Sequence, residues 1–208
     1  MPRKDVERVV HSLSAEFLDV KDEAEVEASM EQVPQDLGSE VAANKLLGKL
    51  CECKESQRGS LIQLMLLLID KNRILEKDLR AQTQLVFESL EDIVVDVPHV
   101  YENFAFAMAV LLRTNALDFA WFQAEARSVL REEQPFTRLL SAVFRAYDVD
   151  RLAPWSWDLV TSAKDVLFVA HRDKNPKAFM DFVENHQLWA TYVEPLSAKI
   201  VEQARLAH

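Results

Sequence analysis

The pattern of this 208-residue sequence changes at one octapeptide, Asp92-Ile93-Val94-Val95-Asp96-Val97-Pro98-His99. It interrupts helical periodicity with two carboxylates four residues apart, followed by a proline. Pro98 fits the first turn of a new helix, where its missing N–H costs nothing, and Val97 before it is biased toward an extended conformation. We therefore expect an acidic elbow between two helices. Asp96 is expected at or just before the N-cap of the second helix, while Asp92 is expected in the connecting segment.

Apolar residues recur at helical spacing on both sides of the elbow. They predict helices around residues 6–18, 26–33, 46–50, 61–69, 79–90 and 100–112, and again around 119–130, 139–147, 155–170, 179–183 and from 195 onward. Paired helices of about 35–40 residues per pair are typical of a HEAT-like solenoid. The sequence thus predicts an all-α helical-repeat solenoid of about five antiparallel hairpins, with an irregular helical bundle as the alternative. Only three glycines occur, which suits a chain made mostly of helices.

Charge is spread unevenly along the chain. Its net value is −10, from 34 acids and 24 bases, and residues 1–117 alone hold 21 acids and 13 bases. An acidic first half disfavours direct nucleic-acid binding, because phosphates would be repelled. It is compatible with a basic protein partner, or with a role in solubility alone. No apolar run reaches the roughly 20 residues of a membrane span, and no signal-peptide pattern opens the chain, so we expect the cytosol or the nucleus.

Motifs of catalysis are absent from the sequence. It has no glycine-rich phosphate loop, no G-x-S-x-G elbow and no H-E-x-x-H helix, and its five histidines are scattered. Cys51 and Cys53 lie two apart on a predicted helix, cannot pair locally, and form a poor zinc signal. We therefore expect no enzyme, no metal, no cofactor and no small-molecule ligand. Trp155 and Trp157 are compatible with an exposed recognition patch or with packing onto the preceding hairpin.

The octapeptide resembles the D-x-x-x-D-[VI]-P-H signature of the MA-3 (also called MI) domain. That helical-repeat module occurs in eukaryotic translation initiation factor 4 gamma and in programmed cell death protein 4. Near the N-terminus, Glu16-Phe17-Leu18 followed by Asp22 and Glu25 resembles the family's E-[FY]-L-x-x-x-D-x-x-E-A first hairpin. It departs at Val26, where the family usually has alanine, which implies a slightly different helix separation. A third match is the leucine-rich helix followed by Ile74-Leu75-Glu76-Lys77-Asp78-Leu79.

The resemblance covers about residues 3–117 and implies an MA-3 domain over residues 1–117. Residues 118–208 are expected to be a helical-repeat extension continuous with it, so that the two form one structural unit. Only one signature is visible and about two hairpins follow it. The chain is therefore most similar to the middle HEAT domain of the initiation factor 4 gamma scaffold, which implies a monomeric domain of a larger cytoplasmic protein.

Family members bind the DEAD-box RNA helicase initiation factor 4 A, and the two signature aspartates form ion pairs with basic residues on its N-terminal lobe. The resemblance implies that Asp92 and Asp96 form these pairs here, in an interaction domain of a translation-initiation scaffold. An exposed ion pair contributes only about 0.2–1 kcal/mol, so water must be excluded around it. Val97, His99 and Val100 are the neighbours expected to do so.

Other functions within the resemblance stay open. The chain is compatible with an inhibitor of the helicase, as programmed cell death protein 4 is in its family. It is also compatible with a HEAT-like scaffold in ribosome biogenesis or splicing, and with a copy that has lost helicase binding and serves as a spacer.

Overall fold

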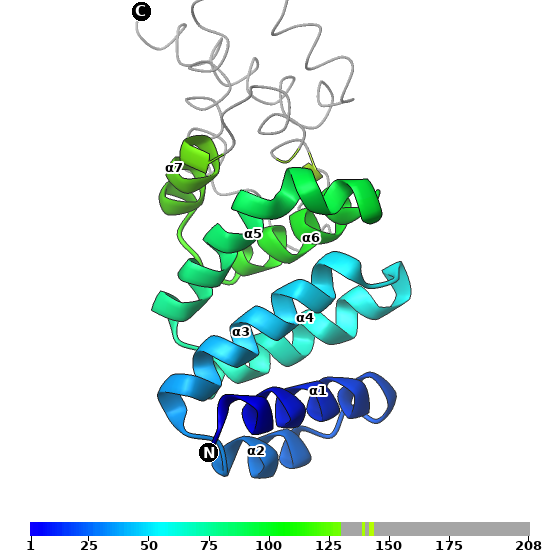
Figure 1. Ribbon diagram of the computed structural model, residues 1–208, viewed down its shortest axis with the longest axis vertical. Coiled ribbons are helices and arrows are strands. Elements are labelled where there is room, and N and C mark those ends of the chain that lie inside the picture. Colours follow the sequence, from blue (N-terminus) through cyan, green and yellow to red (C-terminus); the bar gives the residue numbers. More distant parts are fainter. Residues whose placement is uncertain (130–138, 140–141, 144–208) are drawn as a thin grey trace, which may run out of the picture. The chain divides into compact units, whose positions relative to one another are not determined.

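The computed structural model describes residues 1–129, 139 and 142–143, all within the first, Met1–Tyr147, of the two units into which the chain divides (Figure 1). These residues form seven helices and no strand. The helices are α1 (Arg3–Asp19), α2 (Glu23–Glu31), α3 (Gln35–Glu52), α4 (Glu55–Asp70), α5 (Glu76–Asp96), α6 (Val100–Arg113) and α7 (Phe119–Val129). The predicted all-α class is confirmed.

Consecutive helices pair into three hairpins, α1/α2, α3/α4 and α5/α6, and each hairpin packs on the next (Figure 1). The first hairpin meets α3 and α4, and the second meets α5 and α6. The turns inside the three hairpins, α1–α2, α3–α4 and α5–α6, lie along one edge of this stack, on the right in Figure 1. The described residues thus form a helical-repeat solenoid, as the periodicity predicts.

The core of the solenoid is densest at its third hairpin. Helix α6 is buried along most of its length, and Phe104 is fully enclosed. The ring of Phe87 on α5 meets Phe104 edge-on, with 5.3 Å between ring centroids, and lies 5.7 Å from the ring of Phe122 on α7. Aromatic pairs of this geometry add about 0.5–1.5 kcal/mol each beyond their buried area. This cluster fixes α5 against its neighbours.

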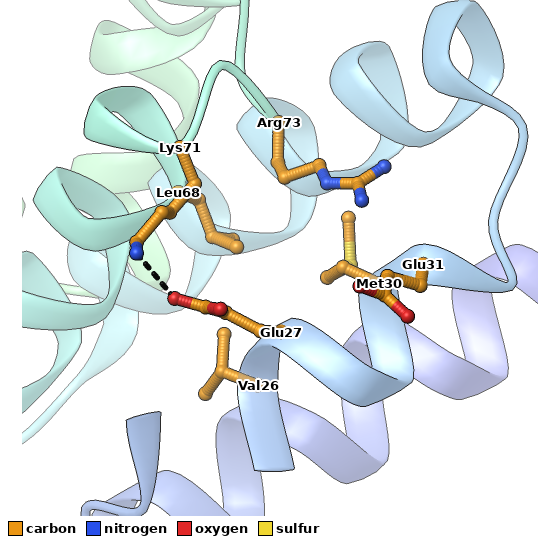
Figure 2. A pocket seen from close by; sticks show the side chains of 7 residues that line it. All are labelled: Val26, Glu27, Met30, Glu31, Leu68, Lys71 and Arg73. Carbon is orange, nitrogen blue, oxygen red and sulfur yellow. Dashed lines mark ion pairs between the residues drawn. The ribbon is translucent and has the colours of Figure 1, made fainter. Parts of the chain in front are cut away.

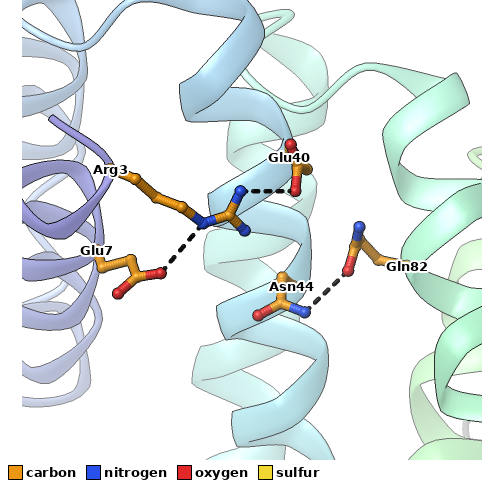
Figure 3. Close-up of polar contacts among 5 residues, drawn as sticks. All are labelled: Arg3, Glu7, Glu40, Asn44 and Gln82. Carbon is orange, nitrogen blue, oxygen red and sulfur yellow. Dashed lines mark hydrogen bonds and ion pairs between the residues drawn. The ribbon is translucent and has the colours of Figure 1, made fainter. Parts of the chain in front are cut away.

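Polar contacts set the register of the stacked odd-numbered helices (Figure 3). Arg3 on α1 donates to Glu40 on α3 at 2.9 Å, and Asn44 on α3 donates to Gln82 on α5 at 2.8 Å. The hydroxyl of buried Ser39 on α3 accepts from the N–H of Leu75 at 2.8 Å and donates to the carboxylate of Asp78 on α5. The start of α5 is thereby held against α3.

The structure describes only part of the chain after α6. The helix predicted from residue 119 is present as α7, and Leu139, Ala142 and Val143 are buried. The helices expected from residue 155 onward and the arrangement of Trp155 and Trp157 lie outside the described residues. The total of five hairpins and the continuity of residues 118–208 with the first domain therefore stay predictions.

Candidate partner-binding site

The acidic elbow is largely helical. Helix α5 continues through Asp96, and only residues 97–99 separate it from α6. The predictions that Asp92 lies in a connecting segment and that Asp96 caps α6 are therefore wrong, because His99 holds the N-cap position. The cause is packing: Phe87 and Leu90 are buried, and the half-buried residues 93, 94 and 97 continue that apolar stripe at helical spacing. Burial of the stripe overrides the weak helix propensity of the valines.

A tight turn follows the end of α5. Val97 has φ −123° and ψ 83°, which is non-helical but falls short of the extended conformation predicted for a residue before proline. Its carbonyl accepts from the N–H of Val100 at 3.0 Å, which closes a four-residue turn with Pro98 in the second position. Proline is favoured there, since its φ is preset and no N–H is required. Pro98 therefore lies in this turn, and not in the first turn of α6 as predicted.

Four of the five predicted site residues reach the surface. Asp92, Asp96 and His99 are exposed, and Val97 is half-buried. Val100 is 0% exposed and belongs to the core, where the apolar face of α6 places it, so it offers no surface to a partner.

Sequence reasoning missed the apolar residues beside these carboxylates. Val95 is 79% exposed, and Leu85, two turns before Asp92 on the same face of α5, is 51% exposed. The seven-residue spacing between Leu85 and Asp92, which is two helical turns, is the sequence signal that places Leu85 on the same face as Asp92. We give the name α5 surface to the exposed residues Leu85, Asp92, Val95 and Asp96, together with half-buried Val97 directly after them.

The two aspartates are placed against the electrostatic preferences of their helix. They lie four residues apart, and therefore on one face, in the last turns of α5, where no basic residue occurs. The C-terminal end of a helix carries partial negative charge, so the carboxylate of Asp96 in the last turn is disfavoured, and the two carboxylates repel each other. Among the described residues, neither carboxylate has a hydrogen bond or an ion pair, and no Lys or Arg occurs in sequence between Arg80 and Arg113.

The C-terminal end of α2 carries a pair of acids with the same spacing that does lie near basic side chains. Glu27 and Glu31 have the same four-residue spacing and line a hollow of about 120 Å³ together with Lys71 and Arg73 (Figure 2). Lys71 forms an ion pair with Glu27, which raises the pKa of the lysine. Cations from the segment between α4 and α5 thus face the glutamates. The aspartates of α5 have no such counterpart in the described part of the chain.

Two cysteines lie at the C-terminal end of α3. Both cysteines are free thiols; burial, the main cause, raises the pKa of Cys51 to about 12, and it also raises the pKa of Cys53. Nowhere in the described ranges do three or more side chains gather that could hold a metal ion. Within the same ranges, no helix combines the length and apolar character that crossing a bilayer requires.

The MA3 domain, known as a protein-interaction helical domain of translation-related proteins, matches residues 6–118, which span the three hairpins and the whole α5 surface. No curated protein and no solved structure matches the chain. The family match covers more than half of the sequence and agrees with the octapeptide signature and with the observed hairpins. The chain therefore belongs to the MA3 domain family.

Proposed function

We propose that this chain is a non-enzymatic interaction domain that binds a basic protein surface through Asp92 and Asp96. The observation that carries the proposal is the aspartate pair itself, which lies at the end of α5 without a hydrogen bond or an ion pair among the described residues. Two carboxylates at these positions do not stabilise the helix itself. Arginine-rich surfaces recognise such pairs well, because a guanidinium donates two parallel hydrogen bonds to a carboxylate.

The partner we propose is the N-terminal lobe of the DEAD-box RNA helicase initiation factor 4 A. Support comes from the family, whose members are protein-interaction domains of translation-related proteins, and from the D-x-x-x-D-V-P-H sequence at residues 92–99. The chain would then serve in a cytoplasmic translation-initiation scaffold, where its docking would set the orientation of the helicase lobe.

Apolar neighbours determine how strongly such a contact can bind. An exposed ion pair contributes about 0.2–1 kcal/mol, whereas truncating one member of a desolvated pair costs about 2–5 kcal/mol. Val95 and Val97 flank Asp96 and are available to cover the ion pairs once a partner docks. The contact therefore belongs to the stronger class only if the partner also buries these valines.

A pull-down with the helicase tests the proposal. We expect Asp92→Ala and Asp96→Ala each to lose most of the retained helicase, while Glu27→Ala and Glu31→Ala retain it, since those glutamates lie on the first hairpin. Far-ultraviolet circular dichroism checks that each variant is folded. If folded Asp92→Ala and Asp96→Ala variants bind like the wild type, the proposal fails.

Unwinding of a short RNA duplex separates a scaffold from an inhibitor. For a scaffold domain we expect the unwinding rate of the helicase to be unchanged or increased when the chain is added. A decrease that disappears in Asp92→Ala would show that the same site serves inhibition.

A further inference from the structure

A second hollow lies between the two helices of the first hairpin, close to their turn. Its volume is about 180 Å³, and its floor is formed by the buried side chains of Leu13, Phe17 and Val26. Val20, which is 73% exposed, stands at its rim. A cavity of about 150 Å³ holds one benzene, so this hollow has room for one apolar side chain. We call it the α1–α2 groove.

Carboxylates complete the rim of the α1–α2 groove. Glu16, Asp22 and Glu25 line it, all three exposed. Asp22 has a structural reason to be there, because its carboxylate accepts from the N–H groups of Ala24 and Glu25 and caps α2. The carboxylate of Glu16 has no hydrogen bond or ion pair within the described residues. Between residues 15 and 27 the sequence holds six acids and one base, so the groove combines an apolar floor with a strongly negative rim.

We propose that the α1–α2 groove is a second docking site, which captures one aliphatic or aromatic side chain of a protein segment with Lys or Arg beside it. The apolar anchor would fill the hollow over Phe17 and Val26, while the adjacent base would pair with Glu16 and Glu25. Interfaces commonly gain most of their affinity from one such buried anchor, and charges at the rim select the partner.

Charge complementarity distinguishes this occupant from a second copy of the chain. The first 117 residues carry 21 acids and 13 bases, so two copies would approach each other against net repulsion. The groove also lies near the α1–α2 turn, on the same edge of the solenoid as the α5–α6 turn (Figure 1). A basic partner that runs along this edge is therefore able to reach both sites, although groove binding does not depend on the α5 surface.

The test uses the full 208-residue chain, labelled with ¹⁵N, and a capped synthetic peptide with one leucine between two arginines. We expect amide signals of Val20, Asp22 and Val26 to shift on titration. Replacing both rim charges, in Glu16→Gln/Glu25→Gln, should weaken binding about tenfold, as two partly exposed ion pairs would. The matched control is Asp92→Asn/Asp96→Asn, which removes the same charge from the α5 surface and should leave the titration of the Val20, Asp22 and Val26 signals as it is in the wild type.

Three outcomes would overturn the inference. One is the absence of shifts at the groove at millimolar peptide. Another is equal binding of a peptide with leucine between two glutamates. The third is a chain that sediments as a dimer and becomes monomeric in Val20→Ser, because the groove would then hold a second copy. If Asp92→Asn/Asp96→Asn loses helicase binding but keeps the peptide-induced shifts, the α1–α2 groove and the α5 surface are separate binding sites.

Discussion

Asp92 and Asp96 oppose the stability of α5, and that makes their removal informative. A carboxylate in the last turn of a helix, such as Asp96, costs about 0.3–1 kcal/mol, and repulsion from Asp92 four residues earlier adds about 0.2–0.5 kcal/mol. We therefore expect Asp92→Asn/Asp96→Asn to raise the free energy of unfolding by about 1 kcal/mol, as measured by urea denaturation at low ionic strength. Glu27→Gln/Glu31→Gln, with the same spacing at the end of α2, should show no such gain because Lys71 pairs with Glu27. A loss of stability in the aspartate variant would mean that the pair helps to hold the fold.

Gly38 is needed for the close approach of α3 to the segment that precedes it. A Cβ at this position would lie 2.6 Å from Cγ1 of Val33, whereas none of the surrounding atoms comes within 4 Å of a Cβ built at Gly48. We expect Gly38→Ala to lower the free energy of unfolding by about 1–3 kcal/mol, as overpacking does. By contrast, Gly48→Ala should raise it by about 0.5–1 kcal/mol, since alanine is the better helix former. Urea denaturation compares the two, and equal gains would contradict the close approach.

One buried side chain fastens α6 to the end of α3. The amide nitrogen of Asn103 donates to the carbonyls of Cys51 and Cys53 at 2.8 and 2.9 Å, and its oxygen accepts from Nε of Arg58 at 2.6 Å. Each buried group left without a partner costs about 1–3 kcal/mol, so we expect Asn103→Ala to lower stability by at least about 2 kcal/mol. Asn44→Ala, which removes a single hydrogen bond between exposed Asn44 and buried Gln82, leaves one atom without its partner where Asn103→Ala leaves three, and should cost about 1 kcal/mol. Similar losses in thermal or urea melts of the two variants would contradict this account of α6.

The buried thiol at the end of α3 predicts an alkaline limit to stability. Burial raises the pKa of Cys51 from 9.0 to about 12, with smaller contributions from the charges of Glu52 and Cys53. Below pH 9 the thiol is protonated in both the folded and the unfolded chain, so stability is unaffected. Between pH 9 and about 12 the thiol ionises only in the unfolded chain, so the free energy of unfolding falls over this range. At pH 10 the loss should be on the order of 1 kcal/mol. Urea denaturation should therefore show a steeper fall between pH 8 and pH 10 in the wild type than in Cys51→Ala, and parallel curves would contradict it.

The helices themselves were largely predictable, and the end of α5 was not. Periodic apolar residues located α1 through α7 because each helix buries one stripe against its neighbours. At Val94 and Val95 the local signals pointed away from helix: β-branched residues, then a proline. Packing of the adjacent stripe decided the outcome, and the side-chain directions of Asp92 and Asp96 followed from it. Val100 is buried by the packing of α6 against its neighbours, and the sequence spacing alone does not show this.

At the scale of the whole solenoid, some of the acidic residues of the first half gather on two separate surfaces. The α5 surface and the α1–α2 groove lie toward one edge, at the turns of the third and first hairpins (Figure 1). The sequence showed the excess of acids but not their grouping, because grouping requires the direction in which each hairpin runs. Turns that share an edge let one elongated partner meet several of them, as in other helical solenoids.

Titration of the helicase N-terminal lobe into the chain over a salt series tests the central claim, that Asp92 and Asp96 form the docking site. For the wild type we expect affinity to fall as salt rises, because screening weakens exposed charge pairs. Asp92→Asn/Asp96→Asn should bind at least about tenfold more weakly, with little remaining salt dependence. Glu27→Gln/Glu31→Gln, with the same loss of charge on another hairpin, should match the wild type. Equal affinity and equal salt dependence in the wild type and the aspartate variant would contradict the claim.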